Sequence, residues 1–431
     1  MVKVVRSQMR YPYAMKSQKR RREEHSLRGL LLLLLAVIPP CTADLPAFSW
    51  DRISTFAFPG IGPGCGLGKS GCVGLDATYT TEALLNFSRY GLVLVQGSNY
   101  SQYNNGSWRA TQQHEEARFA SRLASIAKNA GNKPPHVFPY IAAYAPQAWY
   151  EAQARFNDPE PEWESMWLKD SKGLVSTMQP GRAGSCSTTT NEHGNYNQYP
   201  WRRLYDWRVN ATRRYFIDRV LHFIRNDTGF VSGSFFDDWT SVAARSIPCA
   251  SASVPCDTCK CECGEWSPDE QAEFMEATLE ALQEVIDAMS AAEKLSVIST
   301  VDGGCYTTGT TGCTGGQANN PFAEHFTQRA MAMLRGVDNR PKGWRFREAF
   351  CNQGSDLPIT NWSATTASCL HDVRYLLQEP AASTAHLVHG HGDGSNTFEF
   401  LLAAFLIVAQ ENWYFSCSGH SHSQDPRVKD C

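Results

Sequence analysis

The stretch Gly233-Ser-Phe-Phe-Asp-Asp-Trp-Thr240 decides the fold, because it has the pattern of a buried strand that ends in two adjacent carboxylates and an indole. Residues 229–236 are nearly continuously apolar or small, as a parallel strand covered on both faces should be. Asp237 and Asp238 then stand at its carboxyl end, the rim where an α/β barrel gathers its catalytic groups. Trp239 offers a flat face on which a sugar ring could stack. The alternative is that one aspartate caps the next turn and the other is solvated.

Strand-like segments recur along the chain with helical patterns or long loops between them, which is typical of alternating β and α units. Eight such segments are expected, at 53–60, 90–97, 136–144, 204–207, 229–238, 294–302, 344–351 and 385–391. Helical spacing predicts helices over 115–130, 210–225, 268–290, 321–334, 365–377 and 397–409. The last of these is apolar nearly all round, which favours a buried helix that closes the barrel. We therefore expect an α/β protein, a (β/α)8 TIM barrel in which the 229–238 strand is the fifth.

The N-terminal segment, residues 1–43, has the features of a secretory signal peptide with a long basic n-region. Basic residues precede the apolar run 30–38, and Ala43 ends a plausible cleavage site. An uncleaved membrane anchor is the alternative, although the run is much shorter than the roughly twenty residues that a span needs. Residues 44–431 are then expected to form a single barrel domain, secreted or held in the lumen of the secretory pathway.

Two further features agree with secretion. N-glycosylation sequons occur at Asn86, Asn99, Asn105, Asn210, Asn226 and Asn361. Of the fifteen cysteines, Cys41 is removed with the signal peptide and an even number remains. The cluster between Cys249 and Cys263 has spacings that also occur in zinc sites, but an oxidising compartment favours disulfides. We expect long, disulfide-stapled loops at the carboxyl ends of the strands.

Composition excludes several classes of protein. The formal net charge is −3 at pH 7, so no basic field is available for nucleic acid. The motifs of serine-triad hydrolases, zincins, P-loop proteins and dinucleotide-binding proteins are absent. We therefore expect no cofactor and no bound metal, and a membrane partner only if the N-terminal segment is an uncleaved anchor.

Acidic residues collect at the expected strand ends. Besides Asp237 and Asp238 on one strand, Asp302 ends the next strand and Glu348 lies near the end of the one after it. Glycosidic cleavage needs two such groups: a protonated acid for the leaving oxygen, and a carboxylate that acts as nucleophile or as base for water. Side chains alternate along a strand, so only one of the adjacent aspartates should face the cleft, and we favour Asp237. Asp302 could instead be a turn residue, and Glu348 could pair with a neighbouring arginine.

Other candidates are substrate-binding residues. Asp206 and Trp207 could shape a sugar subsite, with helix capping as the alternative for Asp206. His389, His391 and Asp393 lie in a glycine-rich turn after the last expected strand, where they could bind hydroxyl groups. Metal ligation by these three residues is a less favoured alternative.

The order of these segments resembles the TIM-barrel glycoside hydrolases, including uncharacterised families distantly related to the alpha-galactosidase, alpha-amylase and polygalactosaminidase groups. The resemblance rests on 90–97, 136–141 leading to Tyr144, Asp206-Trp207 before a helix, and 233–239. It implies an aspartate nucleophile at one strand end, here Asp237 or Asp238, with an acid/base on a later strand, here Asp302 or Glu348. Tyr144 is a further candidate for substrate binding. One departure is the count, since the resemblance places the aspartate on the fourth strand rather than the fifth.

The sequence thus favours a secreted glycoside hydrolase that acts on an oligo- or polysaccharide. The alternative is a barrel that has lost catalysis and binds glycans as a lectin-like extracellular protein.

Overall fold

Eight parallel strands form one sheet in the computed structural model, in the order β1-β2-β3-β6-β7-β8-β9-β10. The strands are β1 (Phe56–Ala57), β2 (Leu92–Val95), β3 (His136–Ala142), β6 (Gly233–Asp237), β7 (Leu295–Ser299), β8 (Gly343–Arg347), β9 (Ala385–His391) and β10 (Tyr414–Ser418). A parallel bridge joins Thr55 to Phe415, and the Phe415 N–H donates to Ser54 O at 2.9 Å. The last strand therefore meets the first, and the sheet closes into a barrel.

The structure describes residues 54–57, 81–95, 112–143, 161–169, 177–178, 202–227, 229–237, 239, 268–299, 321–335, 341–347, 350–351, 362–378, 385–391 and 395–418. The chain divides into the units Met1–Thr42 and Ala43–Cys431, and all described residues belong to the second. In this described part, no helix has both the length and the apolar character that crossing a membrane requires.

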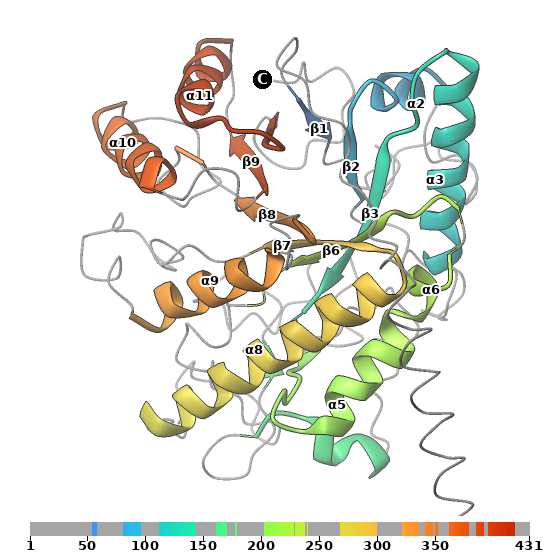
Figure 1. Cartoon of the computed structure of the whole chain (residues 1–431), viewed down its shortest axis with the longest axis vertical. Helices are drawn as coiled ribbons and strands as arrows, with labels where there is room; N and C mark the ends of the chain where they lie inside the picture. The colour runs from blue at the N-terminus through green and yellow to red at the C-terminus, as the bar shows by residue number, and fades with distance from the viewer. Residues whose placement is uncertain are drawn as a thin grey trace, which may run out of the picture. The chain divides into compact units, whose positions relative to one another are not determined.

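Helices alternate with the strands, as Figure 1 shows. They are α2 (Thr81–Phe87), α3 (Gln112–Asn129), α5 (Asn210–Tyr215), the π-helical turn η2 (Phe216–Val220), α6 (His222–Arg225), α8 (Pro268–Ala291), α9 (Pro321–Leu334), α10 (Trp362–Gln378) and α11 (Ser395–Val408), with a 3-10 helix η1 (Pro161–Met166) between β3 and β6. The α/β alternation with a closed parallel sheet is that of a (β/α)8 barrel.

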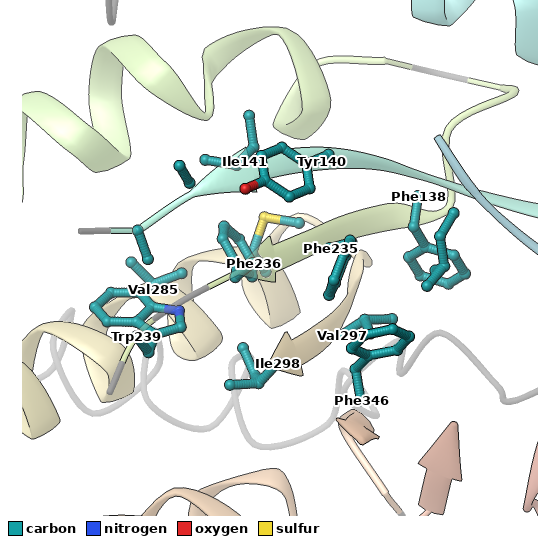
Figure 2. Close-up of a cluster of buried hydrophobic side chains, with 14 of the residues drawn as sticks. Phe138, Tyr140, Ile141, Phe235, Phe236, Trp239, Val285, Val297, Ile298 and Phe346 are labelled. Atoms are coloured by element: carbon teal, nitrogen blue, oxygen red, sulfur yellow. The ribbon is translucent and has the colours of Figure 1, made fainter. Parts of the chain in front are cut away.

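Aromatic rings from strands that are not neighbours meet inside the barrel. The Phe138 ring on β3 lies 5.7 Å from Trp344 on β8, and the Phe346 ring lies 4.8 Å from Phe235 on β6. Figure 2 shows Phe138, Phe235 and Phe346 in this cluster. Because β8 is separated from β6 by one strand and from β3 by two, side chains that meet across these distances must point inward. Alternation then assigns the remaining strand positions to the interior or to the helix-covered exterior.

Helix α8 illustrates why the exterior helices form where they do. Its first residue is Pro268 and its first turn carries Asp269 and Glu270, which suit the positive end of a helix. Buried residues at helical spacing then face the sheet: Phe274, Met275, Leu279, Leu282, Val285 and Ile286. The helix that helical spacing predicts over 268–290 is thereby confirmed, and this stripe is its core face.

The expected strand at 204–207 is not a barrel strand. Its backbone pairs with the antiparallel segment before it, where Leu168 N–H donates to Leu204 O and Asp206 N–H donates to Met166 O. This pairing continues the small two-stranded sheet of β4 (Thr177–Met178) and β5 (Arg202–Arg203).

The eighth barrel strand is β10, which the sequence analysis did not identify. The expectation that the apolar helix closes the barrel is also wrong, because α11 leaves Leu406 and Ile407 more than half exposed and β10 makes the closure. These corrections change the count in the barrel. β6 becomes its fourth strand, the position that the resemblance to glycoside hydrolases implies for the aspartate.

One disulfide is described, between Cys351 after β8 and Cys369 on α10. Beside it, the buried Asp372 carboxylate accepts hydrogen bonds from Arg347 and from the Cys351 N–H. These contacts fix the end of β8 to α10. The disulfide pairs cysteines that the sequence analysis did not pair, and the cysteine cluster at 249–263 lies outside the described residues.

Candidate active site

Asp237 is the last residue of β6 and lies on the inward face of the barrel. It stands two residues beyond the inward-facing Phe235, and its pairing partner across the sheet is Ala142 of β3. The Ala143 N–H donates to Asp237 O at 2.9 Å, which continues the parallel ladder to the strand end. The half-buried carboxylate is therefore held at the carboxyl end of the barrel, the end where barrel enzymes carry their catalytic groups.

Tyr140 is the described partner of this carboxylate. Its hydroxyl donates to Asp237 Oδ2 at 2.8 Å, across the boundary between β3 and β6. The ring packs edge-on against Phe235 with centroids 5.6 Å apart, and Figure 2 shows the Tyr140 side chain beside β6. The sequence alone assigns Tyr140 no role, although Tyr140 lies in the expected strand 136–144. Once the β3–β6 register is known, its proximity to Asp237 follows.

Several hydrogen bonds hold the loop that leads into β6. Asp227 accepts hydrogen bonds from the backbone N–H groups of residues 229, 230 and 231, and the Lys294 ammonium donates to Asp227 O and Val231 O. Burial raises the pKa of the Asp227 carboxyl, but these N–H donors and Lys294 outweigh it, so the pKa lies below its ordinary value. The entry to β6 is thereby tied to the start of β7, which fixes the strand that carries Asp237.

Trp239 and Trp207 lie in the core behind β6. Their rings are 5.2 Å apart, and Phe216 of the π-helical turn contacts both, with Phe236 also next to Trp239. Trp239 is 1% exposed and Trp207 is 2% exposed. This packing does not meet the expectation of an open indole face for a sugar ring. In this structure both indoles support the strand end from outside the barrel.

The Asp206 carboxylate also forms hydrogen bonds within the protein. Its carboxylate accepts from Arg208 Nε at 2.9 Å, from Arg208 Nη2 at 2.8 Å and from the Arg208 backbone N–H at 3.1 Å. The hydrogen bond from the guanidinium to Asp206 raises the pKa of Arg208. Helix α5 begins at Asn210 with Val209 as its N-cap, so Asp206 does not cap it directly. Contact between Asp206 and a sugar stays a prediction.

His389 lies on the inward face of β9 and is buried. Its ring stacks on Phe346 at 5.9 Å and lies 6.2 Å from Phe56. His389 is therefore deeper in the aromatic core than a turn residue at the rim would be. His391 ends β9, two residues closer to the carboxyl end of the barrel, and nothing is described of its side chain.

The remaining predicted site residues lie outside the described residues. They are Asp238, Asp302, Glu348, Tyr144 and Asp393. Among the described residues, no group of three or more His, Cys, Asp or Glu side chains is arranged to hold a metal ion. The described site therefore consists of Asp237 held by Tyr140, with its partner acid and any sugar contacts still predictions.

Comparison with protein-family models and with curated proteins gave no match. Among solved structures, the glycoside hydrolase domain of PelA from Pseudomonas aeruginosa matches 87% of this chain and 98% of its own, at 9% identity and a TM-score of 0.38. An alpha-N-acetylgalactosaminidase from Bifidobacterium bifidum matches 83% of this chain, at 9% identity and a TM-score of 0.37, and this chain spans only 51% of it.

Glycoside hydrolases are thus among the matched structures, as the resemblance in the sequence implies. A protein named TcOYE matches at a similar level, with 12% identity, a TM-score of 0.36, and coverage of 81% of this chain and 83% of its own. Similarity this low carries no argument about activity or about individual residues. The fold assignment rests on the strand pairing described above.

Proposed function

We propose that this protein is a secreted glycoside hydrolase in which Asp237 is one of two catalytic carboxylates. The observation that carries the proposal is the position of Asp237, on the inward face at the carboxyl end of the fourth barrel strand. A carboxylate at this edge faces the region where barrel enzymes bind substrate. Asp302 and Glu348 follow the next two barrel strands in sequence, so one of them is the proposed partner acid.

The role of Asp237 follows from its hydrogen bond. A carboxylate that accepts a bond from a phenol is favoured in its ionised form. An ionised group suits the nucleophile or the base, whereas the group that protonates the leaving oxygen must hold a proton. Asp237 is therefore the proposed nucleophile or base, and the partner on a later strand supplies the acid.

The test is hydrolysis of a panel of aryl glycosides and polysaccharides by the purified protein and by Asp237→Asn. We expect the wild-type protein to cleave at least one substrate and the variant to lose kcat/KM by about 10³-fold or more, because the amide can neither attack nor take a proton. Asp218→Asn is the matched control, since Asp218 is an exposed aspartate on the outer π-helical turn and should keep full activity. Full activity of Asp237→Asn would contradict the proposal.

A glycan array separates the proposed hydrolase from a lectin-like barrel. Binding of a glycan without turnover, in a protein that hydrolyses nothing on the panel, would favour the glycan-binding alternative. Binding followed by cleavage of the same glycan would support the hydrolase.

Secretion is part of the proposal and rests on the sequence of residues 1–43 and on the sequons. In a eukaryotic secretory host the mature chain should begin after Ala43 and carry N-linked glycans. Retention of the first 43 residues in a membrane fraction would instead identify an anchor.

A further inference from the structure

Tyr140 and Asp237 form a pair that the sheet itself brings together. β3 and β6 are neighbours in the barrel, with Tyr140 opposite Phe235 and Ala142 opposite Asp237. The tyrosine therefore starts one inward position below the aspartate, and the length of its side chain brings the hydroxyl to Asp237 Oδ2 at 2.8 Å. Both groups come from strands of the closed sheet rather than from loops.

Both partners of this pair are held in place. The Tyr140 side chain is 6% exposed and its ring is fixed by the edge-on contact with Phe235. The backbone of Asp237 is fixed by the hydrogen bond from Ala143 N–H to its carbonyl oxygen. Two rigidly supported groups at hydrogen-bond distance lose little entropy on pairing, which is the condition for a precisely oriented reactive group.

We propose that Tyr140 is a positioning residue that holds Asp237 Oδ2 and so fixes the orientation in which the carboxylate meets substrate. This inference rests on the proposed function of Asp237. As a nucleophile, the carboxylate bonds to the anomeric carbon while the glycosidic C–O bond breaks and the leaving oxygen takes a proton from the partner acid. As a base, the carboxylate takes a proton from the water that bonds to the anomeric carbon as the glycosidic C–O bond breaks. In both cases the hydrogen bond from the phenol favours the ionised form of the carboxylate and restricts its rotation.

The inference can be tested without a known substrate, by labelling with a diazo compound. Such a reagent esterifies only the protonated acid: the acid proton moves to the diazo carbon, and the carboxylate displaces dinitrogen. Peptide mass spectrometry then gives the fraction of Asp237 ester at each pH. In Tyr140→Phe the ionised form loses the hydrogen bond from residue 140, so the pH of half-maximal labelling should rise by about one unit.

Tyr414→Phe is the matched control, because Tyr414 is another buried tyrosine of the barrel interior, in edge-on contact with Trp344. It should leave the labelling of Asp237 unchanged. If Tyr140→Phe fails to fold, 3-fluorotyrosine at position 140 keeps the ring and makes the phenol a stronger donor, so the half-maximal pH should fall. An unchanged half-maximal pH in whichever folded variant is measured would overturn the proposal.

Activity separates this inference from the proposed function. On a glycoside that the wild-type protein cleaves, Tyr140→Phe should lower kcat more than it changes KM and move the acidic limb of the pH profile upward. If the labelling shifts as expected but Asp237→Asn still hydrolyses the substrate, the positioning contact stands and the proposed function fails. If Asp237→Asn is inactive and Tyr140→Phe leaves both labelling and kcat unchanged, the positioning role fails alone.

Discussion

At the scale of single residues, the Asp206–Arg208 pair anchors the chain just before α5. Two guanidinium nitrogens and one backbone N–H converge on a carboxylate whose side chain is 8% exposed. A buried carboxylate that loses its cation keeps the cost of desolvation without the compensating interaction. Removing Arg208 should therefore destabilise the protein by more than the intact pair stabilises it.

Arg208→Ala should lower the free energy of unfolding by about 2 kcal/mol, because Asp206 would keep only the backbone N–H of residue 208 among these donors. Urea unfolding gives the value. Arg219→Ala, at an exposed position of the π-helical turn, should change it by less than about 0.5 kcal/mol. Equal effects of the two substitutions would show that the Asp206 contact is of no consequence.

At this scale the candidate catalyst Asp237 could be predicted from the sequence, but its hydrogen-bond partner Tyr140 could not. Alternation along the strand favours one of the adjacent aspartates, and the inward position of Phe235 assigns Asp237 to the interior. Tyr140 could not be found in this way, because its contact depends on the register between strands almost a hundred residues apart. The burial of Trp239 could not be predicted either, because it depends on tertiary contacts with Trp207 and Phe216, which lie more than twenty residues earlier in the chain.

At the scale of elements, β6 lies so close to β7 that position 233 has no room for a side chain. A Cβ on Gly233 would overlap the Leu295 backbone oxygen and would lie 2.9 Å from the Phe138 ring. Backbone atoms cannot move away as a flexible side chain can, so glycine is required here. Gly229, four residues earlier in the same approach, has nothing within 4 Å of an added Cβ.

Gly233→Ala should therefore destabilise the protein by about 3 kcal/mol or more, whereas Gly229→Ala should change stability by less than about 1 kcal/mol. The measurement is thermal or urea unfolding of the two variants in parallel. Because Gly233 leads directly to Asp237, a folded Gly233→Ala should also show a displaced strand end. A Gly233→Ala variant as stable as Gly229→Ala would mean that β6 and β7 are not packed as described.

The sequence predicted seven of the barrel strands because each is an apolar segment followed by polar residues and a helix. It failed at 204–207, where Leu204, Tyr205 and Trp207 look like a strand but are buried beside the π-helical turn instead. It missed β10, although Trp413, Tyr414 and Phe415 are strongly strand-forming, because the apolar helix before them was taken as the last element. Only the pairing between β1 and β10 shows that the barrel is closed by β10 and not by the apolar helix.

At the scale of the whole molecule, His136 makes stability depend on pH. It begins β3 at the end of the barrel opposite Asp237, and its ring lies 3.1 Å from Ser232 Oγ. Burial, with a smaller contribution from Lys133, lowers its pKa from 6.5 to about 4. The folded protein therefore resists protonation that the unfolded chain accepts, and stability should fall as the pH drops from 6.5 toward 4.

This loss should reach about 3 kcal/mol near pH 4 relative to neutral pH for the His136 contribution alone. His136→Gln has no ring to protonate, so the difference in unfolding free energy between it and the wild-type protein should shrink or reverse on acidification. His222→Gln, at an exposed position of α6, should follow the wild-type pH dependence. The same pH dependence in His136→Gln and the wild-type protein would exclude His136 as the cause.

The most direct test of the two-carboxylate site is the distance from the Asp237 carboxyl to those of Asp302 and Glu348 in a crystal structure with a sugar bound at the carboxyl end of the barrel. We predict that at least one of the two lies across the sugar from Asp237, at about 5–5.5 Å for a retaining enzyme or about 6.5–9.5 Å for an inverting one. Separations of both acids beyond about 10 Å, with no other carboxylate in that range, would contradict the account.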